Sequence, residues 1–135
     1  MLETLKSATN EVFQTAFGVD ISTIDKLVNT GYITDIELKS GNIEYISFVF
    51  EETLLKEIAE LLGTGESSEE ICDLACELTN LIAGKAKVLL LTNGRECLMG
   101  TPNFLGAKEN PHGYADVSFS TKDGAFTITL GKIRG

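Results

Sequence analysis

The sequence predicts an α/β fold of the α+β type, in which an antiparallel or mixed β-sheet carries packed helices on one face. Two observations support this prediction. Apolar residues recur at helical spacing in three segments, and short runs of β-forming residues are joined by glycine-bearing turns. Their order is α-ββ-αα-βββ, and hairpin-linked strands form antiparallel sheets that one layer of helices can cover. The 135 residues suffice for one core, so we expect a single domain over residues 1–135.

Two shorter helices and one hairpin are predicted in the first half of the chain. Apolar residues at helical spacing predict a helix over residues 2–17, ended by Gly18, and a second one over residues 51–62. Residues 19–30 are expected to form a connection. The hairpin is predicted from two runs of β-forming residues, 32–38 and 43–50, on either side of a turn at residues 39–42.

The last third of the chain is predicted to be mainly extended. Residues 115–120 alternate between apolar and polar side chains, which predicts a half-buried strand. Asp123 and Gly124 form a strong hairpin-turn signal before a second run of this kind, residues 126–130. Shorter extended segments are expected near residues 95–100 and 102–106.

The longest predicted helix spans residues 68–91. Ser67 lies three residues before Glu70, which is the spacing of a capping box at a helix start. At about 100° per residue, one side of this helix is apolar and is expected to be buried. The residues of that side are Ile71, Leu74, Leu78, Leu81, Ile82 and Leu89.

The opposite face of this helix has an unusual composition. Asp73, Glu77, Asn80 and Gly84 fall within an arc of about 60°. Asparagine is a poor residue inside a helix because its side chain competes for backbone hydrogen bonds. A glycine there costs about 1 kcal/mol relative to alanine. Both on one face indicate that another molecule approaches this face closely.

The pair Glu77 and Asn80 has a chemistry suited to phosphoryl transfer. Residues three apart project from the same side of a helix, so the carboxylate can anchor a cation while the carboxamide accepts and donates hydrogen bonds. These groups could hold a water in line with a phosphorus atom, a reaction that needs mainly positioning and charge neutralisation. Taken alone, the spacing also fits an ordinary solvated helix face.

The wider spacing resembles a known signature. Asp73, Glu77, Asn80 and Pro102 form the pattern D-x3-E-x2-N-x21-P, which resembles the signature of the CheC/CheX/FliY chemotaxis phosphatases at every defined position. The segments E-L-T-N-L-I-A-G-K-A-K and T-P-N-F-L-G also look like the CheX type. CheC-type members carry two E-x2-N helices. This chain has one, since Gln14 stands where a second copy would need asparagine, so the resemblance favours a CheX-type member with a CheC-like fold.

The resemblance implies an enzyme, a hydrolase of the aspartyl phosphate on a CheY-type response regulator in chemotaxis or two-component signalling. It implies that Asn80 orients the attacking water and that Glu77 pairs with the regulator's active-site lysine. Asp73 would support docking, Pro102 would shape the adjacent loop, and Gly84 would permit close approach. The Mg²⁺ of the reaction would belong to the regulator, so no cofactor is expected in this chain.

Charge and composition restrict the partners. The chain has 11 Lys and Arg against 20 Asp and Glu, a net charge of −9, which argues against nucleic acid and anionic membrane surfaces. No apolar run reaches the about 18 residues of a membrane span. The first residues lack the pattern of a signal peptide, so we expect a cytoplasmic protein.

The cysteines do not predict a metal site. Cys72 and Cys76 lie one helical turn apart, but zinc needs about four ligands, and only Cys97 and His112 could add to the pair. We expect small, semi-buried thiols.

Two further functions remain open. The chain could be a non-catalytic CheX-like binding module, or an interaction protein related to the flagellar switch. The intact pair Glu77 and Asn80 favours the enzyme, since a scaffold would not need both. The resemblance also implies a homodimer, and a hairpin-rich sheet leaves edges that could pair between subunits.

Overall fold

A computed structural model describes residues 1–40, 43–95, 99–106 and 115–131. The helical segments are α1 (Leu2–Val12), the π-helical turn η1 (Phe13–Phe17), α2 (Glu52–Leu62) and α3 (Ser68–Thr92). The strands are β1 (Ser22–Ile24), β2 (Tyr32–Ser40), β3 (Ile43–Phe50), β4 (Asn103–Gly106), β5 (Ala115–Ser120) and β6 (Ala125–Gly131). Within the described residues no helix is long and apolar enough to span a membrane.

The six described strands form one antiparallel sheet in the order β1-β5-β6-β3-β2-β4. This confirms the predicted antiparallel sheet and both hairpins. The β2–β3 hairpin pairs Ile36 with Ile46, and the β5–β6 hairpin pairs Phe119 with Phe126. Because side chains alternate along a strand, this register directs Ile36, Ile46, Phe119 and Phe126 into the core.

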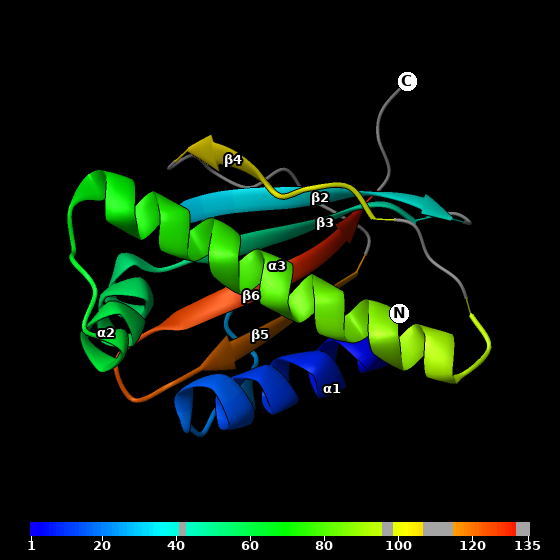
Figure 1. The fold of residues 1–135 in the computed structure, drawn as a ribbon, viewed down its shortest axis with the longest axis horizontal. Coiled ribbons are helices and arrows are strands. Elements are labelled where there is room, and N and C mark those ends of the chain that lie inside the picture. The colour runs from blue at the N-terminus through cyan, green and yellow to red at the C-terminus, as the bar shows by residue number, and fades with distance from the viewer. Residues whose placement is uncertain (41–42, 96–98, 107–114, 132–135) are drawn as a thin grey trace.

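The helices cover one face of the sheet, as predicted (Figure 1). The long helix α3 crosses the sheet diagonally, with α1 beside it and α2 at one end. The core beneath them contains a group of aromatic rings: Phe126 lies 5.5 Å from Phe13 and 5.4 Å from Phe50, measured between ring centroids. This packing attaches η1, at the end of the first helix, to strands β3 and β6 of the sheet.

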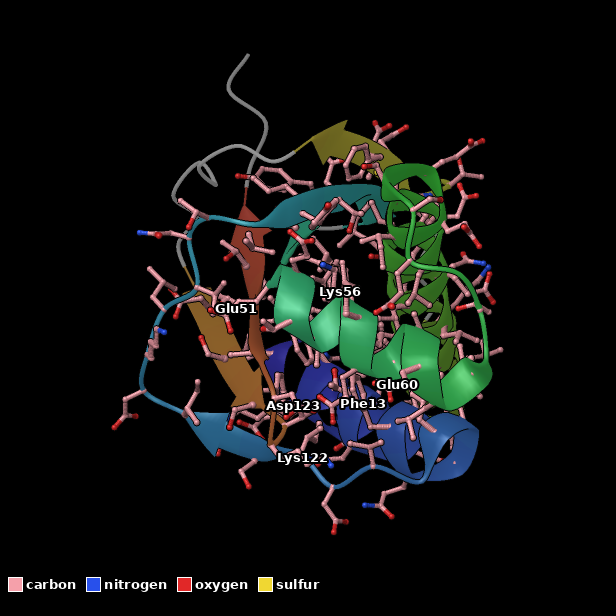
Figure 2. The ribbon with its side chains drawn as sticks, turned by 90° about the vertical axis from the view of Figure 1, so that its left-hand side faces the viewer. Phe13, Glu51, Lys56, Glu60, Lys122 and Asp123 are labelled. Carbon is pink, nitrogen blue, oxygen red and sulfur yellow. The ribbon has the colours of Figure 1, made fainter. Side chains whose placement is uncertain are left out.

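The connection between α1 and β2 differs from the expectation. Residues 19–30 were expected to lack regular structure, but Ser22–Ile24 form β1, which pairs with β5 at one edge of the sheet. The segment then runs along the sheet face away from the helices (Figure 2), where Val28 is buried with Ile33 and Val49. The Val28 amide donates to the Thr127 hydroxyl at 2.8 Å. This cover explains why the second sheet face is partly buried.

The helix predicted over residues 2–17 is continuous but not uniform. Its first part is the α-helical α1, and its last five residues form the wider turn η1. Gly18 ends it in the left-handed region, with a φ of 63°. The boundary prediction is therefore confirmed, and the change of helix type is new.

Helix α3 begins with the predicted cap. The Glu70 amide donates to the Ser67 hydroxyl at 3.2 Å, and that hydroxyl donates to the Glu70 carboxylate at 2.8 Å. Most of the apolar side expected to be buried is buried, but Leu81 is not: 37% of it is exposed. The buried stripe also includes Ala75 and Thr79, and Leu81 lies on the other side of Leu78 from these residues.

Some predictions fall outside the described residues. These are the centre of the first hairpin turn, Gly41 and Asn42, as well as Cys97 and His112. The extended segment expected near 102–106 is confirmed as β4. The segment near 95–100 is described only in part, and there Met99 forms an isolated bridge with Leu38.

The sheet edge at β4 is a surface through which the expected homodimer could form, and the homodimer stays a prediction. Strand β4 pairs with β2 on one side and ends the sheet on the other, and its Phe104 is 39% exposed. An edge that has no second neighbour among the described strands, with an exposed aromatic ring on it, is suited to pairing with a second copy. Light scattering at tens of micromolar should report twice the mass of one chain. A monomer at all such concentrations would contradict the prediction.

A candidate active site on helix α3

The unusual face of α3 is exposed to solvent. Asp73, Glu77, Asn80 and Gly84 are all exposed, whereas Leu78, between them in sequence, is completely buried. The orientation follows from the amphipathic pattern, because α3 can bury its apolar stripe against the sheet only by turning these four residues outward.

Three of these side chains line one shallow depression together with Pro102. The depression has a volume of about 210 Å³ and is lined by Asp73, Cys76, Glu77, Asn80 and Pro102. Pro102 comes from the segment just before β4, far along the chain from the helix. The fold therefore brings together all four residues of the spaced pattern.

Strand β2 positions both walls of this depression. On the helix side, the Thr79 hydroxyl shares a 2.5 Å hydrogen bond with the Thr34 hydroxyl of β2 and donates to the Ala75 carbonyl at 2.8 Å. On the other side, β4 pairs with β2, and Asn103 donates to the Asp35 carboxylate at 3.4 Å. The residues that make these contacts are sequence neighbours of site residues, since Thr79 precedes Asn80 and Asn103 follows Pro102. The contacts therefore hold the two sides of the depression in place.

The two carboxylates of the site are available for a partner. Within the described part of the chain, no ion pair involves Asp73 or Glu77, whereas Glu3, Glu11, Glu51 and Glu52 each lie within 4.0 Å of a lysine. The depression thus offers two unpaired negative charges beside one carboxamide. Such a surface is suited to a cationic group brought by another molecule.

The thiols near the site are suited to packing rather than to nucleophilic chemistry. Burial raises the pKa of the Cys76 thiol, and the charge of Asp73 and the neighbouring Cys72 raise it further. The pKa of Cys72 is raised by burial and by Asp73 and Glu69. The thiolate is the reactive form, so the raised pKa values make both thiols less reactive at neutral pH. Both are half-buried, as expected.

A second depression adjoins the first and shares Asn80 with it. It has a volume of about 370 Å³ and runs between α3 and the end of α1. Gly84 lies here and not in the first depression. We call this second depression the α1–α3 groove; it is lined by Val12, Thr15, Ala16, Asn80, Leu81, Gly84, Lys85 and Val88.

Nothing in the described structure requires glycine at position 84. A Cβ built on Gly84 would meet no atom within 4 Å, and the residue lies in the interior of α3. We expect Gly84→Ala to raise the free energy of unfolding by about 1 kcal/mol, because alanine restricts the unfolded chain and favours the helix. Chemical denaturation measures this directly. An unchanged or lower stability would show that glycine serves the isolated fold.

Comparison with known proteins decides the family. The family model described as "Chemotaxis phosphatase CheX" matches residues 33–119. The chain belongs to this family. No curated protein matched the chain.

Solved structures share the fold of this CheX-family protein. Chemotaxis protein CheX from Vibrio vulnificus has a TM-score of 0.82 at 22% identity, covering 96% of this chain and 94% of that chain. A CheC-like superfamily protein from a Shewanella species has a TM-score of 0.72 at 27% identity, covering 93% and 92%. A CheX–CheY–BeF3–Mg²⁺ complex from Borrelia burgdorferi has a TM-score of 0.68 at 22% identity, covering 96% and 97%. These likenesses confirm the predicted α+β, CheC-like fold.

Sequence reasoning did not find every residue around the site of this CheX-family chain. Cys76 faces the first depression, and its position between Asp73 and Asn80 on the same helix side was the available signal. Leu81 was assigned to the buried side of α3, although it lines the α1–α3 groove. No sequence pattern marks Ala16 and Val88 as groove residues, because the groove depends on how α1 packs against α3.

A larger depression lies elsewhere on the molecule. It has a volume of about 730 Å³, lies between α2 and the β5–β6 turn, and shares no residue with the site. Figure 2 shows Glu60 of α2 near Lys122 and Asp123 of that turn. Its buried Glu57 already accepts a hydrogen bond from Thr121 at 2.5 Å. Its size alone does not make it the site, because the groups suited to phosphoryl chemistry lie on α3.

Proposed function

We propose that this protein hydrolyses the aspartyl phosphate of a CheY-type response regulator. The observation that carries the proposal is the exposure of Glu77 and Asn80 in one depression beside Pro102. Membership of the CheX family supports a chemotaxis phosphatase-like role. The solved CheX–CheY complex from Borrelia burgdorferi supports a regulator of the CheY type as the partner.

Asn80 acts on the water in this mechanism. Its carboxamide oxygen accepts a hydrogen bond from a water that lies in line with the phosphorus atom. The water oxygen attacks phosphorus, and the bond between phosphorus and the aspartate oxygen breaks. The products are the free aspartate carboxylate and inorganic phosphate, which keeps the protons of the water. Asn80 is neutral, so it orients the water without repelling the phosphoryl group.

Glu77 holds the regulator in register. Its unpaired carboxylate contacts a lysine beside the phosphorylated aspartate through a charge-assisted hydrogen bond. Asp73 lies one helical turn away and adds a weaker attraction for the same basic region. Pro102 closes the far side of the depression and limits how the regulator can enter it.

The metal of the reaction belongs to the partner in this proposal. Mg²⁺ bound by the regulator neutralises charge on the phosphoryl group. The residues of this chain supply water orientation and docking, and no cofactor of its own is needed. Among the described residues, no three His, Cys, Asp or Glu side chains are placed to hold a metal ion.

The direct test is the lifetime of the acyl phosphate. A CheY-type regulator from the same genome is phosphorylated with phosphoramidate, the reagent is removed, and decay is followed with increasing amounts of this protein. We expect the decay rate to rise with protein concentration. Binding without a shorter lifetime would favour the non-catalytic module or flagellar-switch-related interaction protein.

Replacing Glu77 with glutamine should weaken both docking and turnover. Glutamine keeps the size of the side chain but removes the charge, and a charge-assisted hydrogen bond contributes about 1.5–3 kcal/mol. We therefore expect kcat/KM to fall by at least about tenfold. Steady-state kinetics with the phosphorylated regulator measures this change.

Asp73→Asn is the matched control, because it removes a carboxylate from the same exposed helix face. It should change kcat/KM less than Glu77→Gln does. Equal effects of the two variants would mean that general negative charge, rather than a contact made by Glu77, attracts the regulator.

A further inference from the structure

We propose that the α1–α3 groove receives an apolar side chain that the regulator presents beside its phosphorylated aspartate. This inference rests on the proposed function and adds a second contact that selects among regulators. The groove would discriminate by shape and apolarity, whereas Glu77 discriminates by charge.

The groove and the first depression, which contains Glu77 and Pro102, are parts of one surface. Asn80 lines both, with Glu77 and Pro102 on one side and Leu81 and Gly84 on the other. A partner that brings a phosphoaspartate to Asn80 therefore covers the groove at the same time. This continuity points to the regulator as the occupant.

The groove is suited to an apolar group. Leu81 is 37% exposed and Val88 54% exposed, so two large apolar side chains of α3 meet solvent along it. Among the described residues that line it, only Lys85 is charged, and its ammonium group lies 2.8 Å from the Glu11 carboxylate of α1. With that charge already paired, the surface offers little to a charged partner group and gains from covering its apolar atoms.

Gly84 leaves the groove open above the backbone of α3. Since no atom of the described residues lies within 4 Å of a Cβ built there, the space above the helix backbone is open. The glycine costs helix stability without serving the isolated fold. A partner side chain that packs against the α3 backbone accounts for it.

The turn η1 forms the opposite wall. In this wider turn Phe13 points into the core, stacked on Phe126 at 5.5 Å, while Thr15 and Ala16 face the groove. The Thr15 hydroxyl donates to the Glu11 carbonyl at 2.7 Å, so its hydrogen-bond donor is already used within the helix. Single π-helical turns often occur at functional sites, and this one supplies small side chains at the groove.

Val88→Gln tests the groove with little risk to the fold, since Val88 is exposed and glutamine favours a helix more than valine does. We expect the KM for the phosphorylated CheY-type regulator to rise about tenfold, the effect of losing a small apolar contact in a pocket. The kcat should change by less than about twofold, because the contact is equal in ground and transition states. Gly84→Leu, which fills the groove, should raise KM further.

Leu62→Gln is the matched control, because Leu62 is 46% exposed on α2, outside the groove. It should leave both kinetic constants unchanged. If the wild-type protein turns over and both groove variants keep its KM, the inference is wrong while the proposed function stands. If Val88→Gln instead dissociates a dimer and keeps the KM, a second copy occupies the groove and the inference is also wrong.

The inference remains testable if the wild-type protein shows no turnover. Affinity is then measured with the BeF3-activated regulator. A dissociation constant raised about tenfold by Val88→Gln supports the groove contact, while an unchanged constant overturns it.

Discussion

Replacing Asn80 with alanine should lower the stimulated rate of aspartyl phosphate hydrolysis by on the order of 100-fold or more, because a misplaced reacting group costs about that much. The loss should appear in kcat, since the carboxamide acts mainly in the transition state. Asn80 is exposed, so the fold should persist. The measurement is the decay of the acyl phosphate at saturating protein, together with the affinity for the BeF3-activated regulator, which should stay near the wild-type value.

Asn10→Ala serves as the control for this result. Asn10 is also an exposed asparagine inside a helix, but it lies on α1 and its amide donates to the Lys6 carbonyl at 3.0 Å. It should keep wild-type turnover. If Asn80→Ala kept wild-type turnover as well, the water-orienting mechanism would be wrong even though the family assignment stands.

Replacing Leu78 with alanine should have the largest effect on stability. Leu78 is completely buried in the core beneath α3, next to the helix face that carries the site. Truncating such a side chain removes apolar contacts and leaves a cavity, which costs about 2–5 kcal/mol in free energy of unfolding. Chemical denaturation followed by circular dichroism measures this cost.

Leu81→Ala is the paired test of the same helix. Leu81 is 37% exposed and lines the groove, so its truncation removes fewer buried contacts than truncation of the completely buried Leu78. Its truncation should cost less than about 1 kcal/mol. Equal costs for Leu78→Ala and Leu81→Ala would mean that α3 is rotated relative to the sheet, and the exposed face would then be different.

The elements that the sequence predicts well are those with a strong local pattern. The apolar spacing of α3 and its cap at Ser67 are properties of consecutive residues, and the structure contains both. The antiparallel hairpins are likewise encoded locally, by short runs of β-forming residues on either side of turns. Strand β1 was missed because it has only three residues, and it forms by pairing with the edge of β5, far away in sequence.

The site itself was only partly predictable. The shared face of Asp73, Glu77 and Asn80 follows from helix geometry, so the sequence could indicate it. The approach of Pro102 depends on β4 pairing with β2, and the groove depends on the packing of α1 against α3. Leu81 shows the same limit, because helical spacing identifies a face but neighbouring elements decide how much of it is buried.

The most direct test of the central claim is turnover with less protein than regulator. The regulator is phosphorylated continuously with phosphoramidate, and phosphate release is measured with this protein at a small fraction of the regulator concentration. Catalysis by Asn80 predicts that each molecule discharges many regulators, with a rate proportional to the protein and lost in Asn80→Ala. Stimulated release that never exceeds one phosphate per molecule of this protein would contradict the account. So would stimulated release that persists unchanged in Asn80→Ala.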